Sequence, residues 1–198
     1  MTSKEFYQEK LKTESDPIKQ VGWDNEVKAV KRYKQIAKLI PPKTQSIVDY
    51  GCGIGNFSKY VSNKVDYLGM DSFQEYVDAA NDMHPELQVI HCDGKGVIPE
   101  CDIAVLIGVW TLRGKMNDVQ YWNNVVIQLK NILKSVKDQV IVNGFHDQVD
   151  YKDPKLFYHD MNRWIKLANL MQLKIQIQFH GDTYSFRFNK GINISATS

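Results

Sequence analysis

The sequence has no long apolar run and almost no imbalance of charge. In its 198 residues, no stretch reaches the roughly 18 apolar residues that a membrane span needs. Residues 1–20 lack the apolar core and the small-residue cleavage site of a signal peptide. The formal net charge is only +2, which does not mark a nucleic-acid or membrane-surface protein. We therefore expect a cytoplasmic protein without a membrane partner.

Cysteines and familiar catalytic motifs are also scarce. Cys52, Cys92 and Cys101 form no CxxC pair and lie in or beside apolar runs, so we expect reduced and mostly buried thiols. The sequence has no GxSxG elbow, no HExxH motif and no Cys/His cluster at metal-ligand spacing. These absences disfavour hydrolases and metalloenzymes, and we predict no metal site.

What the chain does have is 43% hydrophobic residues, in a length that suits one domain. After a polar start (1–23), apolar residues recur at helical spacing up to the proline pair at 41–42. Strand-like and helical runs then alternate, which predicts parallel β-α-β units in an α/β fold. The predicted strands are 46–50, 66–71, 87–93, 103–110 and 140–145, and the predicted helices between them are 56–62, 73–83 and 117–136.

In the last quarter of the chain, the alternation of strand-like and helical runs ends. Pro154 suits the first turn of a further amphipathic helix that reaches to about Met171. Two runs of alternating polar and apolar residues, 173–179 and 184–188, follow it with a short turn between them. This pattern predicts an antiparallel hairpin in place of another parallel crossover.

A glycine loop follows the first predicted strand and opens a helix. It is Gly51-Cys52-Gly53-Ile54-Gly55-Asn56. A turn without side chains lets a ligand approach the backbone closely, and free N–H groups at a helix start favour an acceptor-rich group. The dinucleotide pattern GxGxxG does not fit, because the third glycine comes one residue early. An NAD(P)-dependent oxidoreductase is therefore the less favoured alternative.

Three aspartates end three successive predicted strands around this loop: Asp49, Asp71 and Asp93. A carboxylate at Asp49 suits a ligand that carries an ammonium group. Asp71, 22 residues further on, has the position from which a carboxylate can bind both hydroxyls of an adenosine ribose. Asp93 could meet an adenine amino group. Each aspartate alone also has a plain interpretation as a turn or capping residue.

The segment from Val48 to Gly55 resembles the first motif of the class I S-adenosylmethionine (SAM)-dependent methyltransferases. This resemblance implies a Rossmann-like three-layer sandwich, with a seven-stranded, mostly parallel sheet, an antiparallel C-terminal hairpin and helices on both faces. Residues 1–45 would form a helical lid and residues 46–198 the SAM-binding domain. With SAM as the cofactor, the implied binding residues are Asp49, Gly51, Cys52, Gly53, Gly55, Asn56, Asp71, Ser72, Asp93, Gly94, Gly108 and Val109.

Methyl transfer from SAM is an in-line displacement, so the protein mainly aligns the reactants and excludes water. Where the acceptor must lose a proton, a base should follow the fourth or fifth strand, and His146 is the candidate catalytic residue. A polar turn is the alternative interpretation of His146. Trp23, Trp110 and Arg113 are candidates for the substrate pocket, although an arginine in that position is more often an ordinary surface residue.

The chain is compact, which favours a small-molecule acceptor. The segment Gly108–Thr111 lacks the Asn-Pro-Pro-Tyr type of motif that marks methylation of exocyclic base amines. Basic residues on the first long helix leave contact with RNA, DNA or an acidic substrate open. An RNA or protein acceptor remains the alternative. A non-catalytic SAM-binding partner subunit is a further alternative, and the sequence predicts no oligomeric state.

Overall fold

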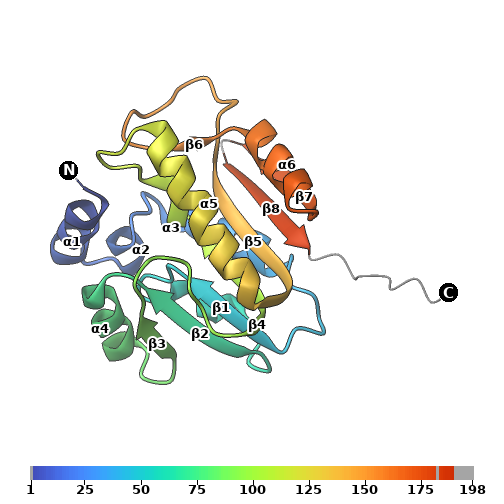
Figure 1. The fold of residues 1–198 in the computed structure, drawn as a ribbon. Helices are drawn as coiled ribbons and strands as arrows, with labels where there is room; N and C mark the ends of the chain where they lie inside the picture. The colour runs from blue at the N-terminus through green and yellow to red at the C-terminus, as the bar shows by residue number, and fades with distance from the viewer. Residues whose placement is uncertain (1, 182, 190–198) are drawn as a thin grey trace.

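The computed structural model describes residues 2–181 and 183–189 of the chain. One mixed sheet lies between two layers of helices (Figure 1), with the strand order β3-β2-β1-β4-β5-β8-β7. The strands are β1 (Ser46–Tyr50), β2 (Asp66–Asp71), β3 (Gln88–His91), β4 (Cys101–Ile107), β5 (Val136–His146), β7 (Lys174–His180) and β8 (Thr183–Asn189). A two-residue strand, β6 (Tyr158–His159), pairs with β5 off this path. The predicted Rossmann-like α/β sheet is confirmed, and β6 adds a strand that was not predicted.

The pairing directions place the loops of the site at one edge. β1 runs parallel to β2 and β4, β2 runs parallel to β3, and β4 runs parallel to β5. β8 runs antiparallel to both β5 and β7, so the predicted hairpin is confirmed. The carboxyl ends of the five parallel strands β1 to β5 therefore meet at one edge of the sheet, where open α/β sheets bind their ligands.

Alternate residues of the central strands point into two separate cores. Val48 and Ala104 face α5 (Asp118–Ser135) and α6 (Met161–Leu170), whereas Ile47 and Ile103 face α3 (Glu26–Ala37) and the 3-10 helix η1 (Asn56–Tyr60). In Figure 1, α5 crosses the near face of the sheet. Three further helices are α1 (Ser3–Thr13), α2 (Pro17–Gln20) and α4 (Gln74–Met83), and a short 3-10 helix, η2 (Val109–Thr111), follows β4. Within the described part of the chain, no helix is both long and apolar enough to cross a bilayer.

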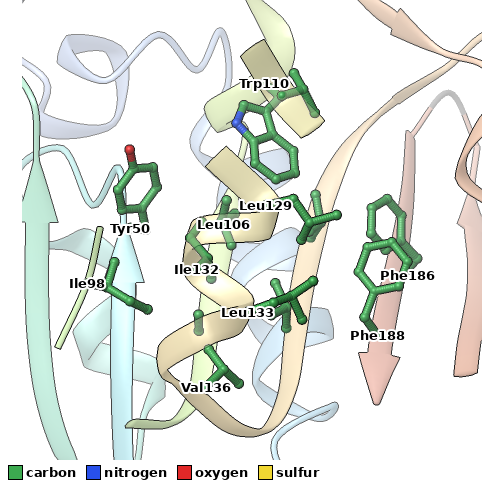
Figure 2. Packing of buried hydrophobic residues seen from close by; sticks show 14 of the residues in the cluster. Tyr50, Ile98, Leu106, Trp110, Leu129, Ile132, Leu133, Val136, Phe186 and Phe188 are labelled. Atoms are coloured by element: carbon green, nitrogen blue, oxygen red, sulfur yellow. The ribbon is translucent and has the colours of Figure 1, made fainter. Parts of the chain in front are cut away.

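The larger core lies between the sheet, α5 and α6 (Figure 2). Its centre is Trp164, which is fully buried. The Trp164 ring lies 4.6 Å from the Phe186 ring and 5.9 Å from the Trp110 ring, measured between centroids. Trp110 belongs to η2, directly after β4. This packing therefore supports the carboxyl end of β4, which is the end at which the site lies.

The structure departs from several of the predicted element bounds. The helix predicted from Pro154 begins at Met161, where the Asp160 carboxylate caps it by accepting the N–H of Asn162 at 2.8 Å. The helix predicted at 56–62 is the shorter 3-10 helix η1, and the strand predicted at 87–93 is shortened to β3. The fourth strand ends at Ile107, before η2. The polar start of the chain folds into α1 and α2.

Candidate functional site

A cavity of about 340 Å³ opens at the carboxyl edge of the parallel strands. This volume is in the range of small-molecule sites. Its walls come from the loops after β1, β2, β3 and β4, from the ends of β5 and β8, and from α5. The segment before α3 closes one side with Tyr7, Val21, Gly22 and Trp23.

The glycine loop forms part of the floor of the cavity. Gly51 and Gly53 adopt left-handed conformations, with φ of +76° and +57°. A Cβ atom on Gly51 would lie 2.6 Å from the Val109 side chain, and one on Gly53 would lie 2.6 Å from the Val21 side chain. Glycine is therefore required by both backbone angle and space, and the loop forms a cradle that only a bare backbone allows.

Asp71 is fixed at the end of β2 by the backbone around it. Its Oδ2 accepts the N–H of Gly53 at 2.9 Å and its Oδ1 accepts the N–H of Phe73 at 3.0 Å. Burial raises the pKa of this carboxyl, and the backbone hydrogen bonds oppose the rise. Asp71 lines the cavity, and each carboxylate oxygen has a second lone pair for a ligand hydroxyl.

Asp49 provides a second buried carboxyl, with only 2% of its surface exposed. Its Oδ2 accepts a hydrogen bond from the Tyr67 hydroxyl at 2.6 Å. Burial raises the pKa of Asp49 to about 7, against the effect of the Tyr67 bond, and the nearby Asp71 adds to the rise. The protonation of Asp49 is therefore sensitive to what binds beside it.

The cavity continues beyond the end of β4. Gly108 has φ of +71°, and a Cβ atom there would meet nothing within 4 Å. Past it, the wall is formed by Asn143, Phe145 and Thr183, which lie where β5 ends and β8 begins. The Asn143 carbonyl accepts the N–H of Gly108 at 3.1 Å and holds the two strand ends together. A ligand on the glycine loop would thus have open space next to it.

The cavity brings together most of the predicted cofactor residues, namely Asp49, Gly51, Cys52, Gly53, Asp71, Ser72, Gly94, Gly108 and Val109. Gly55, Asn56 and Asp93 do not line it. The Asn56 side chain instead donates to the carbonyl of Pro17 at 3.2 Å. Asp93 is exposed and accepts the N–H of Lys95 at 2.9 Å, so at the end of β3 the wall is formed by Cys92.

Among the predicted pocket residues, Trp23 and Trp110 line the cavity, whereas Arg113 lies outside it in an ion pair with Asp118. His146 also lies outside. Its Nε2 donates to the carbonyl of Gly181 at 2.6 Å, and its ring meets the Phe179 ring edge-on. The structure therefore does not place His146 where it could take a proton from an acceptor in this cavity.

Several lining residues were not predicted from the sequence. Asn143 could have been found, because it closes the fifth strand at the ligand edge. The others carry no signal in the sequence, because they reach the cavity only through the packing of separate elements: Tyr7, Phe57, Tyr76, Phe145 and Thr183.

The sequence matches no protein-family model and no curated protein. Many solved structures share its fold. Magnesium protoporphyrin IX methyltransferase from Synechocystis PCC 6803, solved with bound SAH, has 11% sequence identity and a TM-score of 0.65 over 96% of each chain. DesVI of Streptomyces venezuelae has 11% identity and a TM-score of 0.67 over 84% of this chain and 96% of its own. The DhpI-SAM-HEP complex has 9% identity and a TM-score of 0.69 over 94% of this chain and 95% of its own.

At these low identities the likeness concerns the fold. The chain has the Rossmann-like fold seen in SAM-dependent methyltransferases, and in two of the three comparisons the match extends over nearly the whole of this chain. The order of the strands, the antiparallel hairpin and the cavity at the carboxyl edge are all features of this chain's own structure.

Proposed function

We propose that this protein is a SAM-dependent methyltransferase. The proposal is carried by Asp71, whose carboxylate is oriented into the cavity by the N–H groups of Gly53 and Phe73, next to a glycine loop. This is the arrangement that an adenosine ribose beside a bare backbone requires. Proteins with the same fold that were solved with bound SAM or SAH support this choice of cofactor.

The residues present fit such a cofactor along the whole edge. Asp71 would accept the ribose hydroxyls, and Asp49 offers a carboxylate for the ammonium group of the methionine part. The open space at Gly108 suits the reactive end. SAM supplies an activated methyl group on a sulfonium. The chain's own residues then orient the two reactants and exclude water from them.

We infer a small acceptor that carries no negative charge. The cavity wall includes the aromatic residues Trp23, Tyr33 and Phe145. In residues 2–181 and 183–189, no lysine or arginine lines the cavity, whereas two carboxyls do. An anionic acceptor would therefore find no lysine or arginine of the described residues in the wall to pair with. A Cβ atom on Gly108 would meet nothing within 4 Å, and this open space favours an enzyme over a non-catalytic binding subunit.

The cofactor is tested by calorimetric titration of the purified protein with S-adenosylhomocysteine (SAH) and, separately, with NADH. We expect saturable binding of SAH alone. Asp71→Asn should weaken SAH binding by about tenfold or more, because a charged acceptor for two hydroxyls is lost. Asp66→Asn, at the exposed start of the same strand, is the matched control and should bind as the wild type does. Binding of NADH in place of SAH would refute the proposal.

The acceptor is tested by measuring SAH release from SAM with a panel of neutral phenols, amines and aromatic carboxylates, together with an RNA oligonucleotide. Turnover with phenols or amines is expected. The RNA oligonucleotide is included because exposed lysines lie on α3 and at its C-cap, namely Lys28, Lys31, Lys34 and Lys38. Turnover with RNA or carboxylates alone would overturn the acceptor assignment and leave methyl transfer standing.

A further inference from the structure

Tyr7 of α1 reaches the cavity from the start of the chain. Its ring lines the cavity wall. The ring centroid lies 5.9 Å from those of Phe73 and Tyr76, at the beginning of α4. Phe73 also donates its backbone N–H to Asp71. A residue far away in the sequence thus packs against Phe73, whose N–H group binds the carboxylate that we assign to the ribose.

The hydroxyl of Tyr7 lies in a buried, polar corner. Burial raises the pKa of the Tyr7 phenol to about 12, the nearby Asp71 carboxylate adds to the rise, and the Thr111 side chain opposes it. Thr111 lies in η2, after β4, and also lines the cavity. The Tyr7 side chain therefore extends between the ends of β2 and β4, the two strands that flank β1 and its glycine loop.

Hydrogen bonds hold α1 and α2 in this position. The Tyr76 hydroxyl donates to the carbonyl of Gln20 at 2.6 Å and lies 3.2 Å from the carbonyl of Tyr7. The Gln8 side chain donates to the Glu75 carboxylate at 2.5 Å. All these contacts link the beginning of the chain to α4, the helix that follows Asp71. The helix α4 therefore fixes the position of Tyr7, and the residue at its start, Phe73, also binds Asp71.

We propose that Tyr7 is a cofactor-binding residue, whose ring covers the adenosine part of the ligand and whose hydroxyl hydrogen-bonds beside Asp71. The inference rests on the proposed function. It makes α1 a part of the cofactor site, where the sequence had indicated only a helical lid. Ligand binding then holds α1 against α4 through a contact that the free protein lacks.

The test uses calorimetry with three ligands, SAH, adenosine and homocysteine, on the full chain. Tyr7→Phe keeps the ring and should weaken SAH and adenosine binding by the same factor, about threefold to tenfold. Tyr7→Ala also removes the covering ring and should weaken both by a larger factor. Homocysteine binding should not change. Leu11→Ala is the control on the same helix, because Leu11 packs near α4 without lining the cavity.

A second readout separates binding from folding. Trypsin can cleave at Lys10 and Lys12 of α1, and SAH should slow this cleavage in the wild type but not in Tyr7→Ala. Thermal melting without ligand should be nearly unchanged in Tyr7→Phe. If the wild type binds SAH and Asp71→Asn weakens it, while both Tyr7 variants bind as tightly as the wild type, the inference on Tyr7 is wrong and the proposed function stands. If the wild type does not bind SAH, the proposed function itself fails.

Discussion

The Tyr67 hydroxyl donates a hydrogen bond of 2.6 Å to the Asp49 carboxylate, which links β2 to β1, the strand that precedes the glycine loop. Burial raises the pKa of both groups, to about 7 for Asp49 and well above its usual value for Tyr67. The tyrosine therefore remains the donor, and Asp49 is the member of the pair that titrates near neutral pH. This relationship makes ligand binding sensitive to pH.

We expect SAH affinity to fall as the pH drops below about 7. A ligand ammonium prefers the carboxylate form of Asp49, and in the free protein this form is lost through its pKa of about 7. The fall approaches tenfold per pH unit well below that value. Calorimetry between about pH 5.5 and about pH 8 measures it, and proton release at low pH accompanies it. Asp49→Asn should bind weakly with no such dependence, whereas an equal pH dependence in the variant would contradict the assignment.

Protein stability should show the opposite trend. The pKa of Asp49 in the folded protein, about 7, exceeds its ordinary value of 3.8. At pH values between these two, the folded state therefore binds more protons than the unfolded state does. The contribution of Asp49 to the free energy of unfolding therefore decreases as pH rises from about 4 to about 7. Urea unfolding measures the free energy of unfolding of the wild type and of Asp49→Asn across this pH range. The difference between the two proteins should narrow toward low pH. A difference that widens toward low pH would have the wrong sign.

Tyr67→Phe tests the pair from the other side. The variant removes the hydrogen bond that lowers the pKa of Asp49, so the midpoint of the SAH pH profile should move upward. At neutral pH the affinity should fall several-fold, and it should largely recover above about pH 8.5. Tyr60→Phe removes a hydroxyl from a neighbouring tyrosine and should leave the midpoint in place. A loss of affinity that persists at all pH values would indicate a packing defect instead.

The sheet could be predicted from the sequence because its signals are local. The segments that became β1, β2 and β5 are strand-like runs between helical ones, and this alternation by itself predicts parallel crossovers. The stretch before α6 is different. Pro154 gives a valid signal for a helix start, but Phe157 pairs its N–H with the carbonyl of Thr111 at 2.7 Å, and Asp160 caps the real helix. This distant pairing outweighs the local pattern.

The same distinction applies to the site. Residues on the loop after β1 and at the end of β2 were predicted because a strand end fixes their position. Asp93 has an equivalent position in the sequence, but β3 stops at His91, and the chain turns before the carboxylate can reach the cavity. Tyr7 could not be predicted, because its place depends on the docking of α1 onto α4.

Two glycines with similar backbone angles should respond very differently to alanine. Gly96 and Gly181 have φ of +80° and +72°. A Cβ atom on Gly96 would lie 2.8 Å from the Gln128 Cα and would also collide with the Gln128 carbonyl oxygen, whereas one on Gly181 meets nothing within 4 Å. We expect Gly181→Ala to cost about 1–2 kcal/mol from the backbone alone. Gly96→Ala should cost about 1–3 kcal/mol more through overpacking, as measured by urea unfolding, and equal losses would contradict this account.

His146→Ala distinguishes a structural histidine from a catalytic base. The structure uses its Nε2 to bind the Gly181 carbonyl, so we expect a loss of stability of about 1–3 kcal/mol. The kcat with an accepted substrate should change only a few-fold. A general base would give a decrease of about a hundredfold or more. A decrease of that size without a stability loss would restore His146 to the catalytic role that its sequence position suggested.

Asn56→Ala tests whether the end of the glycine loop binds the cofactor or the start of the chain. The Asn56 side chain is buried and donates to the carbonyl of Pro17 in α2 at 3.2 Å. Without this bond the segment around α2 should open more often, so trypsin should cleave at Lys19 faster, while SAH affinity falls less than in Asp71→Asn. The two measurements separate the roles. If Asn56 bound the cofactor directly, Asn56→Ala would weaken SAH binding as strongly as Asp71→Asn does and would leave trypsin cleavage of the free protein unchanged.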